Sequence, residues 1–65
     1  MNGEEVRKMS DEELVVELAR LRRHLYDLRS QAVTEKLEDT TQLSATKRDI
    51  ARLLTEQRAR QLANA

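Results

Sequence analysis

Residues 14–32 read LVVELARLRRHLYDLRSQA, and this stretch decides the fold. Its apolar residues recur at alternating spacings of four and three: Leu14, Leu18, Leu21, Leu25, Leu28 and Ala32. Side chains at these spacings form one stripe along an α-helix, the pattern of a helix packed lengthwise against another helix. Four further apolar residues lie beside the stripe and are expected to widen it: Val15, Val16, Tyr26 and Val33.

The start of this helix is marked by the run Ser10-Asp11-Glu12-Glu13, which has the form of a capping box. The Ser10 hydroxyl can accept from the Glu13 N–H, and the Glu13 carboxylate can accept from the Ser10 N–H. The three acids also suit the positive end of the helix dipole. We therefore expect a helix over about residues 10–34, and Gly3 to Met9 to form one or two turns with Val6 as its buried side chain.

After residue 34 the apolar residues no longer recur at helical spacing, which predicts a turn over about residues 35–40. Asp39, Thr40 and Thr41 are candidate N-caps for a second helix over about residues 41–62. Its apolar stripe is the weaker one: Leu43, Thr46, Ile50, Leu53, Leu54 and Gln57. A short connection forces the second helix to run antiparallel to the first. The sequence thus predicts one all-α domain over residues 1–65, a coiled-coil-like antiparallel two-helix hairpin with a short N-terminal helical turn.

Length and composition limit what such a chain can do alone. A chain of 65 residues buries only roughly 60% of the surface its unfolded form exposes. It has no cysteine and one histidine, which excludes disulfides and predicts no metal site. No apolar run is long enough to span a membrane, and no signal peptide is apparent, so a cytoplasmic protein is expected. Because its small core gives little stability and no disulfide or metal site is expected to add to it, further stability is expected to come from a partner.

Catalysis has little support in the sequence. There is no glycine-rich phosphate loop, and His24 is the only side chain that titrates near neutrality. Two rod-like helices offer no concave pocket for raising a carboxylate pKa or excluding water. We therefore expect no enzyme activity, no cofactor and no small-molecule substrate.

The net charge of zero conceals an uneven distribution. Residues 1–17 hold six acids against Arg7 and Lys8, so the rest of the chain is basic. Nine of the ten later basic residues, all except Lys36, gather in two runs, one on each helix: Arg20, Arg22, Arg23 and Arg29, then Lys47, Arg48, Arg52, Arg58 and Arg60. An antiparallel hairpin could bring them into one surface suited to RNA phosphates. The alternative is a set of ordinary ion pairs with Asp27, Asp49 and Glu56.

Three stretches together resemble one known family. They are Met9-Ser10-Asp11-Glu12-Glu13-Leu14, then Leu28-Arg29-Ser30-Gln31, then Lys47-Arg48-Asp49-Ile50-Ala51-Arg52-Leu53-Leu54-Thr55. Their order and separation are similar to those of the bacterial large-subunit ribosomal proteins of the L-twenty-nine family. The resemblance covers nearly the whole chain. Two departures are a connection without glycine after Val33 and a threonine, Thr46, where the family usually has an aliphatic residue.

The resemblance implies a structural constituent of the large subunit without enzyme activity. Such proteins bind large-subunit ribosomal RNA near the exit of the nascent-chain tunnel, beside the protein of the L-twenty-three family, where nascent-chain factors could also dock. Carried over by motif, the RNA-binding positions are Arg29, Gln31, Lys47, Arg48 and Arg52. Ala51 would be the small residue that permits close approach.

A different class of function stays open from the residues alone. Two hairpins could pair into a four-helix bundle through the stripe from Leu14 to Leu28, widened by Val15 and Val16. The chain would then be a self-associating interaction module, which light scattering with and without ribosomal RNA would distinguish from an RNA-binding monomer.

Overall fold

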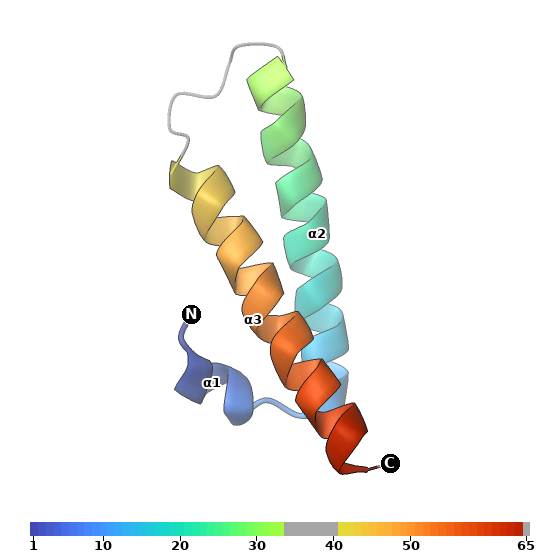
Figure 1. Cartoon of the computed structure of the whole chain (residues 1–65). Coiled ribbons are helices and arrows are strands. Elements are labelled where there is room, and N and C mark those ends of the chain that lie inside the picture. The colour runs from blue at the N-terminus through green and yellow to red at the C-terminus, as the bar shows by residue number, and fades with distance from the viewer. Residues whose placement is uncertain (34–40, 65) are drawn as a thin grey trace.

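The computed structural model describes residues 1–33 and 41–64, and every element in these ranges is a helix. The helices are α1 (Gly3–Arg7), α2 (Asp11–Val33) and α3 (Thr41–Ala63). Figure 1 shows α2 and α3 running antiparallel, with α1 lying against α3 near the end of the hairpin where α2 begins. The molecule is a rod of 44 × 17 × 16 Å. The predicted all-α hairpin is confirmed; the predicted turn and the candidate caps Asp39 and Thr40 lie outside the described residues.

Short polar side chains begin the first two helices. The Asn2 Oδ1 accepts from the Glu5 N–H at 2.9 Å and caps α1. The Ser10 Oγ accepts from the Glu13 N–H at 3.1 Å, and the Ser10 carbonyl accepts from the Leu14 N–H at 3.0 Å. Within the described residues no hydrogen bond joins the Ser10 N–H to the Glu13 carboxylate, so half of the predicted capping box is formed. Ser10 is therefore the N-cap of α2.

The core lies at one end of the hairpin, where all three helices meet. It consists of five buried apolar side chains: Val6, Leu14, Leu18, Leu21 and Leu53. Met9 and Ile50 pack against this cluster and are partly buried. The burial of Val6 was expected, and it makes α1 a third wall of the core. Further along α2, Leu28 is also buried, with 3% of its surface exposed.

The apolar stripe of α2 is narrower than predicted. Leu25 is half-buried and Ala32 is exposed. The four residues expected to widen the stripe are exposed too: Val15, Val16, Tyr26 and Val33. On α3, Leu54 is 39% exposed. The physical reason is that a helix with one long partner covers only its central stripe, whereas a wide apolar face needs partners on both sides.

Thr46 replaces the expected aliphatic residue without leaving a polar group unsatisfied. Its side chain is buried, with 6% exposed, and its hydroxyl donates to the Gln42 carbonyl at 2.8 Å. A buried hydroxyl that bonds back to its own helix avoids most of the desolvation cost. The departure from the family pattern is therefore accommodated within α3.

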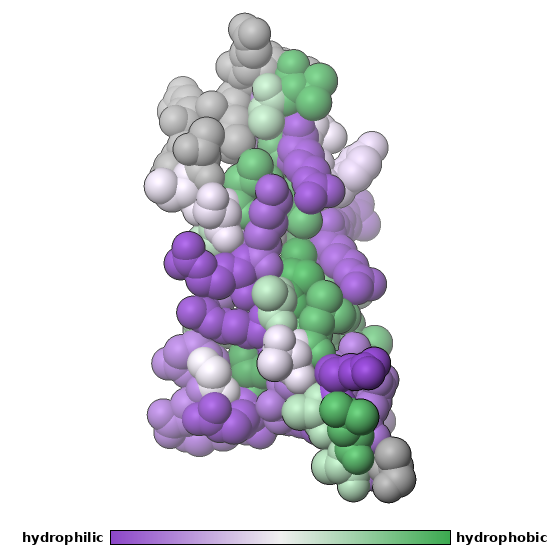
Figure 2. All heavy atoms as spheres, in the orientation of Figure 1, coloured by the Kyte–Doolittle hydropathy of each residue, from purple (hydrophilic) through white to green (hydrophobic). Residues whose placement is uncertain are grey.

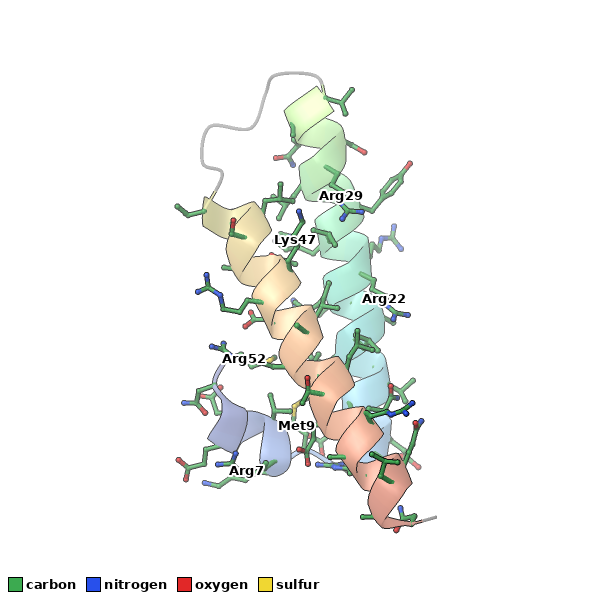
Figure 3. The ribbon with its side chains drawn as sticks, in the orientation of Figure 1. Arg7, Met9, Arg22, Arg29, Lys47 and Arg52 are labelled. Carbon is green, nitrogen blue, oxygen red and sulfur yellow. The ribbon has the colours of Figure 1, made fainter. Side chains whose placement is uncertain are left out.

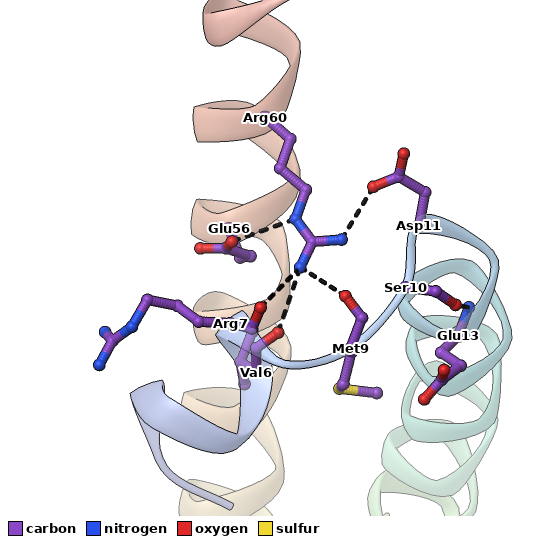
Figure 4. Close-up of polar contacts among 8 residues, drawn as sticks. All are labelled: Val6, Arg7, Met9, Ser10, Asp11, Glu13, Glu56 and Arg60. Carbon is purple, nitrogen blue, oxygen red and sulfur yellow. Dashed lines mark hydrogen bonds and ion pairs between the residues drawn. The ribbon is translucent and has the colours of Figure 1, made fainter.

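Arg60 of α3 holds the end of α1 and the start of α2 (Figure 4). Its Nη2 donates to three carbonyls that follow or end α1, those of Val6 at 3.4 Å, Arg7 at 3.3 Å and Met9 at 2.5 Å. Its Nη1 donates to the Asp11 carboxylate at 2.8 Å, and its Nε to the Glu56 carboxylate at 3.1 Å. The Val6 carbonyl also accepts from the Met9 N–H at 3.2 Å. One guanidinium thus binds three backbone carbonyls at and beyond a helix end.

The same contacts favour the charged form of Arg60. The hydrogen bond to Asp11 raises the pKa of Arg60 above its ordinary value, partial burial opposes the rise, and Glu56 adds to it. Because the guanidinium stays ionised at every physiological pH, this contact between α3 and α1 does not depend on pH in that range.

The position of the core predicts that two leucines of α3 contribute very differently to the free energy of unfolding. Leu53 is 1% exposed and Leu62 is 62% exposed. We expect Leu53→Ala to lower the free energy of unfolding by about 2–5 kcal/mol, because it removes buried methyl groups and leaves a cavity. Leu62→Ala should change it by less than about 0.5 kcal/mol. Urea denaturation followed by circular dichroism measures both, and equal losses would contradict the placement of the core.

The Arg60 contacts predict local rather than global loosening when they are removed. We expect Arg60→Met to speed amide hydrogen exchange in residues 3–9 by roughly tenfold or more, because hydrogen bonds to a charged group contribute about 1.5–3 kcal/mol each. Arg58→Met, two residues away on α3, is the matched control and should leave exchange in α1 unchanged. Unaltered exchange in the Arg60 variant would show that α1 is held by Val6 alone.

Candidate nucleic-acid interface

The candidate site is a charged surface rather than an enclosed pocket. His24 is exposed. Among residues 1–33 and 41–64 no group of acids, histidines or cysteines is arranged to hold a metal ion. No helix in these ranges is long and apolar enough to cross a membrane.

Arg48 and Arg52 lie one turn apart on the same side of α3, and both are exposed. The Arg52 Nη1 donates to the Met1 carbonyl at 2.6 Å and to the Asp49 carboxylate at 3.3 Å. Arg48 makes no ion pair or hydrogen bond with any described side chain. Arg52 is therefore held in place by contacts within the chain, while the Arg48 guanidinium is available to an external anion.

A groove of about 300 Å³ runs between α1 and α3 beside these two residues. Its lining includes Arg48 and Arg52 from α3 and a third arginine, Arg7, from α1. Figure 3 shows Arg7 and Arg52 on the side of the molecule where α1 lies against α3. Sequence reasoning missed Arg7, because nothing local indicates that α1 folds back onto a helix some forty residues later.

The other predicted site residues lie on different faces. Lys47 precedes Arg48 by one residue and so points about 100° away around α3. Figure 3 shows Lys47 extending from α3 at the level of Arg29 of α2, and Arg52 extending from the other edge of α3. Gln31 follows Arg29 by two residues and therefore points to nearly the opposite side of α2. The structure thus places Arg48 beside Arg52 on one side of α3. It brings Lys47 and Arg29 to one level along the hairpin, but it places Gln31 and Arg29 on different sides of α2.

Lys47 and Arg29 belong to a face on which cations and apolar side chains alternate. On α2 its members recur at helical spacing: Val15, Arg22, Tyr26, Arg29 and Val33. On α3 they are Lys47, Leu54 and Arg58. We call these eight residues the mixed face. Figure 2 shows apolar and charged side chains interspersed over both long helices on this side.

Two shallow hollows connect the two halves of the mixed face. One is lined by Val15 of α2 together with Gln57 and Gln61 of α3, and the other by the same two glutamines with Leu54 and Arg58. Because the two hollows share Gln57 and Gln61, the exposed side chains of Val15 and Leu54 lie on one continuous surface. An exposed surface of this kind, rimmed by charge, is typical of a protein contact.

Some of the ion pairs proposed as an alternative to RNA binding are formed. Asp49 pairs with Arg52, and Glu56 pairs with Arg60. Arg20 pairs with Glu17, and the hydrogen bond that it donates lowers the pKa of the Glu17 carboxyl. Asp27 has no ion-pair partner among the described residues. The ion-pair interpretation thus accounts for Arg60 and Arg20 and for part of Arg52, but not for Arg7 or Arg48.

Comparison with known proteins identifies the family. Residues 4–60 match the family described as Ribosomal L29 protein. A protein of Nitratidesulfovibrio vulgaris (strain Miyazaki F) is 53% identical over 55 residues, which cover 85% of this chain and 90% of the relative. One of Crocosphaera subtropica is 49% identical over 59 residues, 91% of this chain and 76% of the relative. One of Persephonella marina is 46% identical over 65 residues, 100% of this chain and 96% of the relative.

Each of these three relatives is named Large ribosomal subunit protein uL29. No solved structure gave a significant match. The resemblance seen in the three sequence stretches is therefore confirmed over most of the chain. With 57 of its 65 residues in the family match (residues 4 to 60 inclusive) and close relatives of nearly equal length, the chain belongs to the Ribosomal L29 protein family.

Proposed function

We propose that this protein is a structural constituent of the large ribosomal subunit that binds large-subunit ribosomal RNA near the nascent-chain exit tunnel. The observation that carries the proposal is the membership of a large-subunit protein family together with the exposed Arg48, which no acid of the described residues neutralises. The proposed RNA-binding residues are Arg29, Gln31, Lys47, Arg48 and Arg52. The protein acts in the cytoplasm, on the ribosome, and without enzyme activity.

The kind of RNA contact follows from the side chains present. Arginine and lysine bind phosphate oxygens, and arginine can do so with two parallel hydrogen bonds. Tyr26 is the only aromatic residue of the chain, so there is no platform on which several unpaired bases could stack. Contacts to phosphates position a protein without reading sequence. Recognition by the shape of the folded RNA is therefore the expected mode.

The mixed face supplies a second contact, with a protein. Tyr26 is 71% exposed and Val33 is 84% exposed. Leaving such side chains in water forgoes the free energy of burying them, about 25 cal/mol per Å² of apolar surface. The neighbour proposed for this face is the ribosomal protein of the L-twenty-three family, and nascent-chain factors are a further candidate.

The packing of the described residues does not favour self-association through the leucine stripe. Leu14, Leu18 and Leu21 are buried against Val6 and Leu53 of the same chain. A second hairpin could reach them only if α1 and α3 moved away. We therefore favour a monomer that gains its remaining stability from the ribosome.

Charge reversal on α3 tests the RNA contact. We expect Arg48→Glu with Arg52→Glu to weaken binding to large-subunit ribosomal RNA and to flatten the slope of log affinity against log salt by about 0.7–0.9 for each phosphate that the variant no longer binds. The matched control is Arg20→Glu with Arg23→Glu, on the part of α2 turned away from α3. Filter binding over a range of salt concentrations measures both, and circular dichroism checks that helicity is retained. Equal behaviour of the two double variants would refute the assignment of α3 as the RNA-binding helix.

A further inference from the structure

We propose that the groove between α1 and α3 binds one backbone phosphate of the RNA and that Arg7 of α1 is a third ligand beside Arg48 and Arg52. This inference rests on the proposed function and adds to it a site and a residue that the family motifs did not indicate. The chemical class of the ligand is a phosphodiester within folded RNA.

The groove has the size and lining that such a group requires. Its volume is about 300 Å³ and it is open to solvent, so a phosphate with parts of the two attached sugars can enter it from outside. Gly3 and Ala51, both in the lining, have little or no side chain to fill the groove. A Cβ added at Gly3 would lie 3.4 Å from the Arg7 Nη1, so the Arg7 guanidinium folds back over the glycine.

The charges around the groove are unbalanced. Its lining holds three arginines and one acid, Glu56, and that carboxylate accepts from the Arg60 Nε at 3.1 Å. Asp49 offsets part of the charge of Arg52. Neither Arg7 nor Arg48 has an ion-pair partner among residues 1–33 and 41–64. Cations that outnumber the nearby acids repel one another in the free protein, and an anion placed between them reduces that repulsion.

Two contacts prepare the site before any RNA arrives. The Met1 carbonyl accepts from the Arg52 Nη1 at 2.6 Å and so fixes one guanidinium against the segment that precedes α1. Arg60 binds the carbonyls of Val6 and Arg7 and so fixes the backbone that carries the Arg7 side chain. Donors held in place before binding lose less conformational entropy on binding.

The experiment removes one cation from the groove and compares it with one removed elsewhere. Arg7→Gln and Arg23→Gln change the net charge equally, but Arg23 lies on α2 outside the groove. With in vitro transcribed large-subunit ribosomal RNA as the probe, we expect Arg7→Gln to weaken binding about tenfold and to flatten the salt slope by about 0.7–0.9. Arg23→Gln should keep the wild-type affinity and slope.

A second pair of variants fills the groove without changing charge. Ala51→Leu places a larger side chain in the groove, whereas Ala59→Leu makes the same change on an exposed position of α3 outside it. We expect only Ala51→Leu to weaken RNA binding. Amide hydrogen exchange in residues 3–9 checks that α1 remains docked in both Arg7→Gln and Ala51→Leu.

The outcomes separate this inference from the proposed function. If wild-type protein binds the RNA without salt dependence, or not at all, the proposed function fails and the groove fails with it. If reversal of Arg48 and Arg52 weakens binding while Arg7→Gln matches Arg23→Gln and Ala51→Leu matches Ala59→Leu, the proposed function stands and the groove is overturned. If Arg7→Gln and Ala51→Leu weaken binding while Arg23→Gln and Ala59→Leu do not, and α1 stays docked, the site is established.

Discussion

Leu53 is the apolar side chain of α3 on which the described core depends. It is 1% exposed, and it is the only member of the buried cluster that α3 supplies, against Val6 from α1 and three leucines from α2. A chain of this size has little apolar surface to bury, so the three helices share a single small cluster. The hairpin cannot open at that end, and α1 cannot leave, without exposing the same side chain. The packing of α1, and with it the groove against α3, therefore depends on this cluster.

The narrow core decides which residues are left for function. Because the leucine stripe is covered within the chain, a partner meets the side chains that lie beside it, among them the mixed face and the arginines near α1. These surfaces differ in chemistry. The mixed face alternates cations with exposed apolar side chains such as Tyr26, which favours a protein neighbour at a contact with RNA nearby. The groove has three arginines with small residues between them, which favours an anion. The two surfaces therefore suit different partners in the proposed function: the mixed face a protein with RNA nearby, and the groove an RNA phosphate.

Local sequence patterns allowed the hairpin to be predicted. The predictions that were wrong concern features that depend on contacts between residues far apart in the chain. The cap at Ser10, the leucine stripe and the buried Val6 each follow from neighbours within a few turns. The expected burial of Val15, Val16 and Ala32 was wrong because a sequence does not show on how many sides a helix will be covered. The contacts of Arg60 join residues 49 to 54 positions apart, and no spacing rule indicates them. The family motif likewise treats Arg29 and Gln31 as one unit, although helical geometry places them on opposite sides of α2.

The arginines show why net charge is a poor guide to the partner of this protein. Arg60 and Arg20 bind acids and carbonyls of the chain itself, so each cancels against an internal charge and contributes little to an external field. Arg7 and Arg48 have no such ion-pair partner among the described residues, so their charges still contribute to the electrostatic field outside the protein. The exposed Glu12 and Glu13, in contrast, stand in the first turn of α2, where the helix dipole favours them and a phosphate would be repelled. A neutral chain therefore presents positive charge along α3 and negative charge at the start of α2. In the proposed complex, this separation favours an approach in which the basic side of α3, rather than the acidic first turn of α2, lies toward the phosphates.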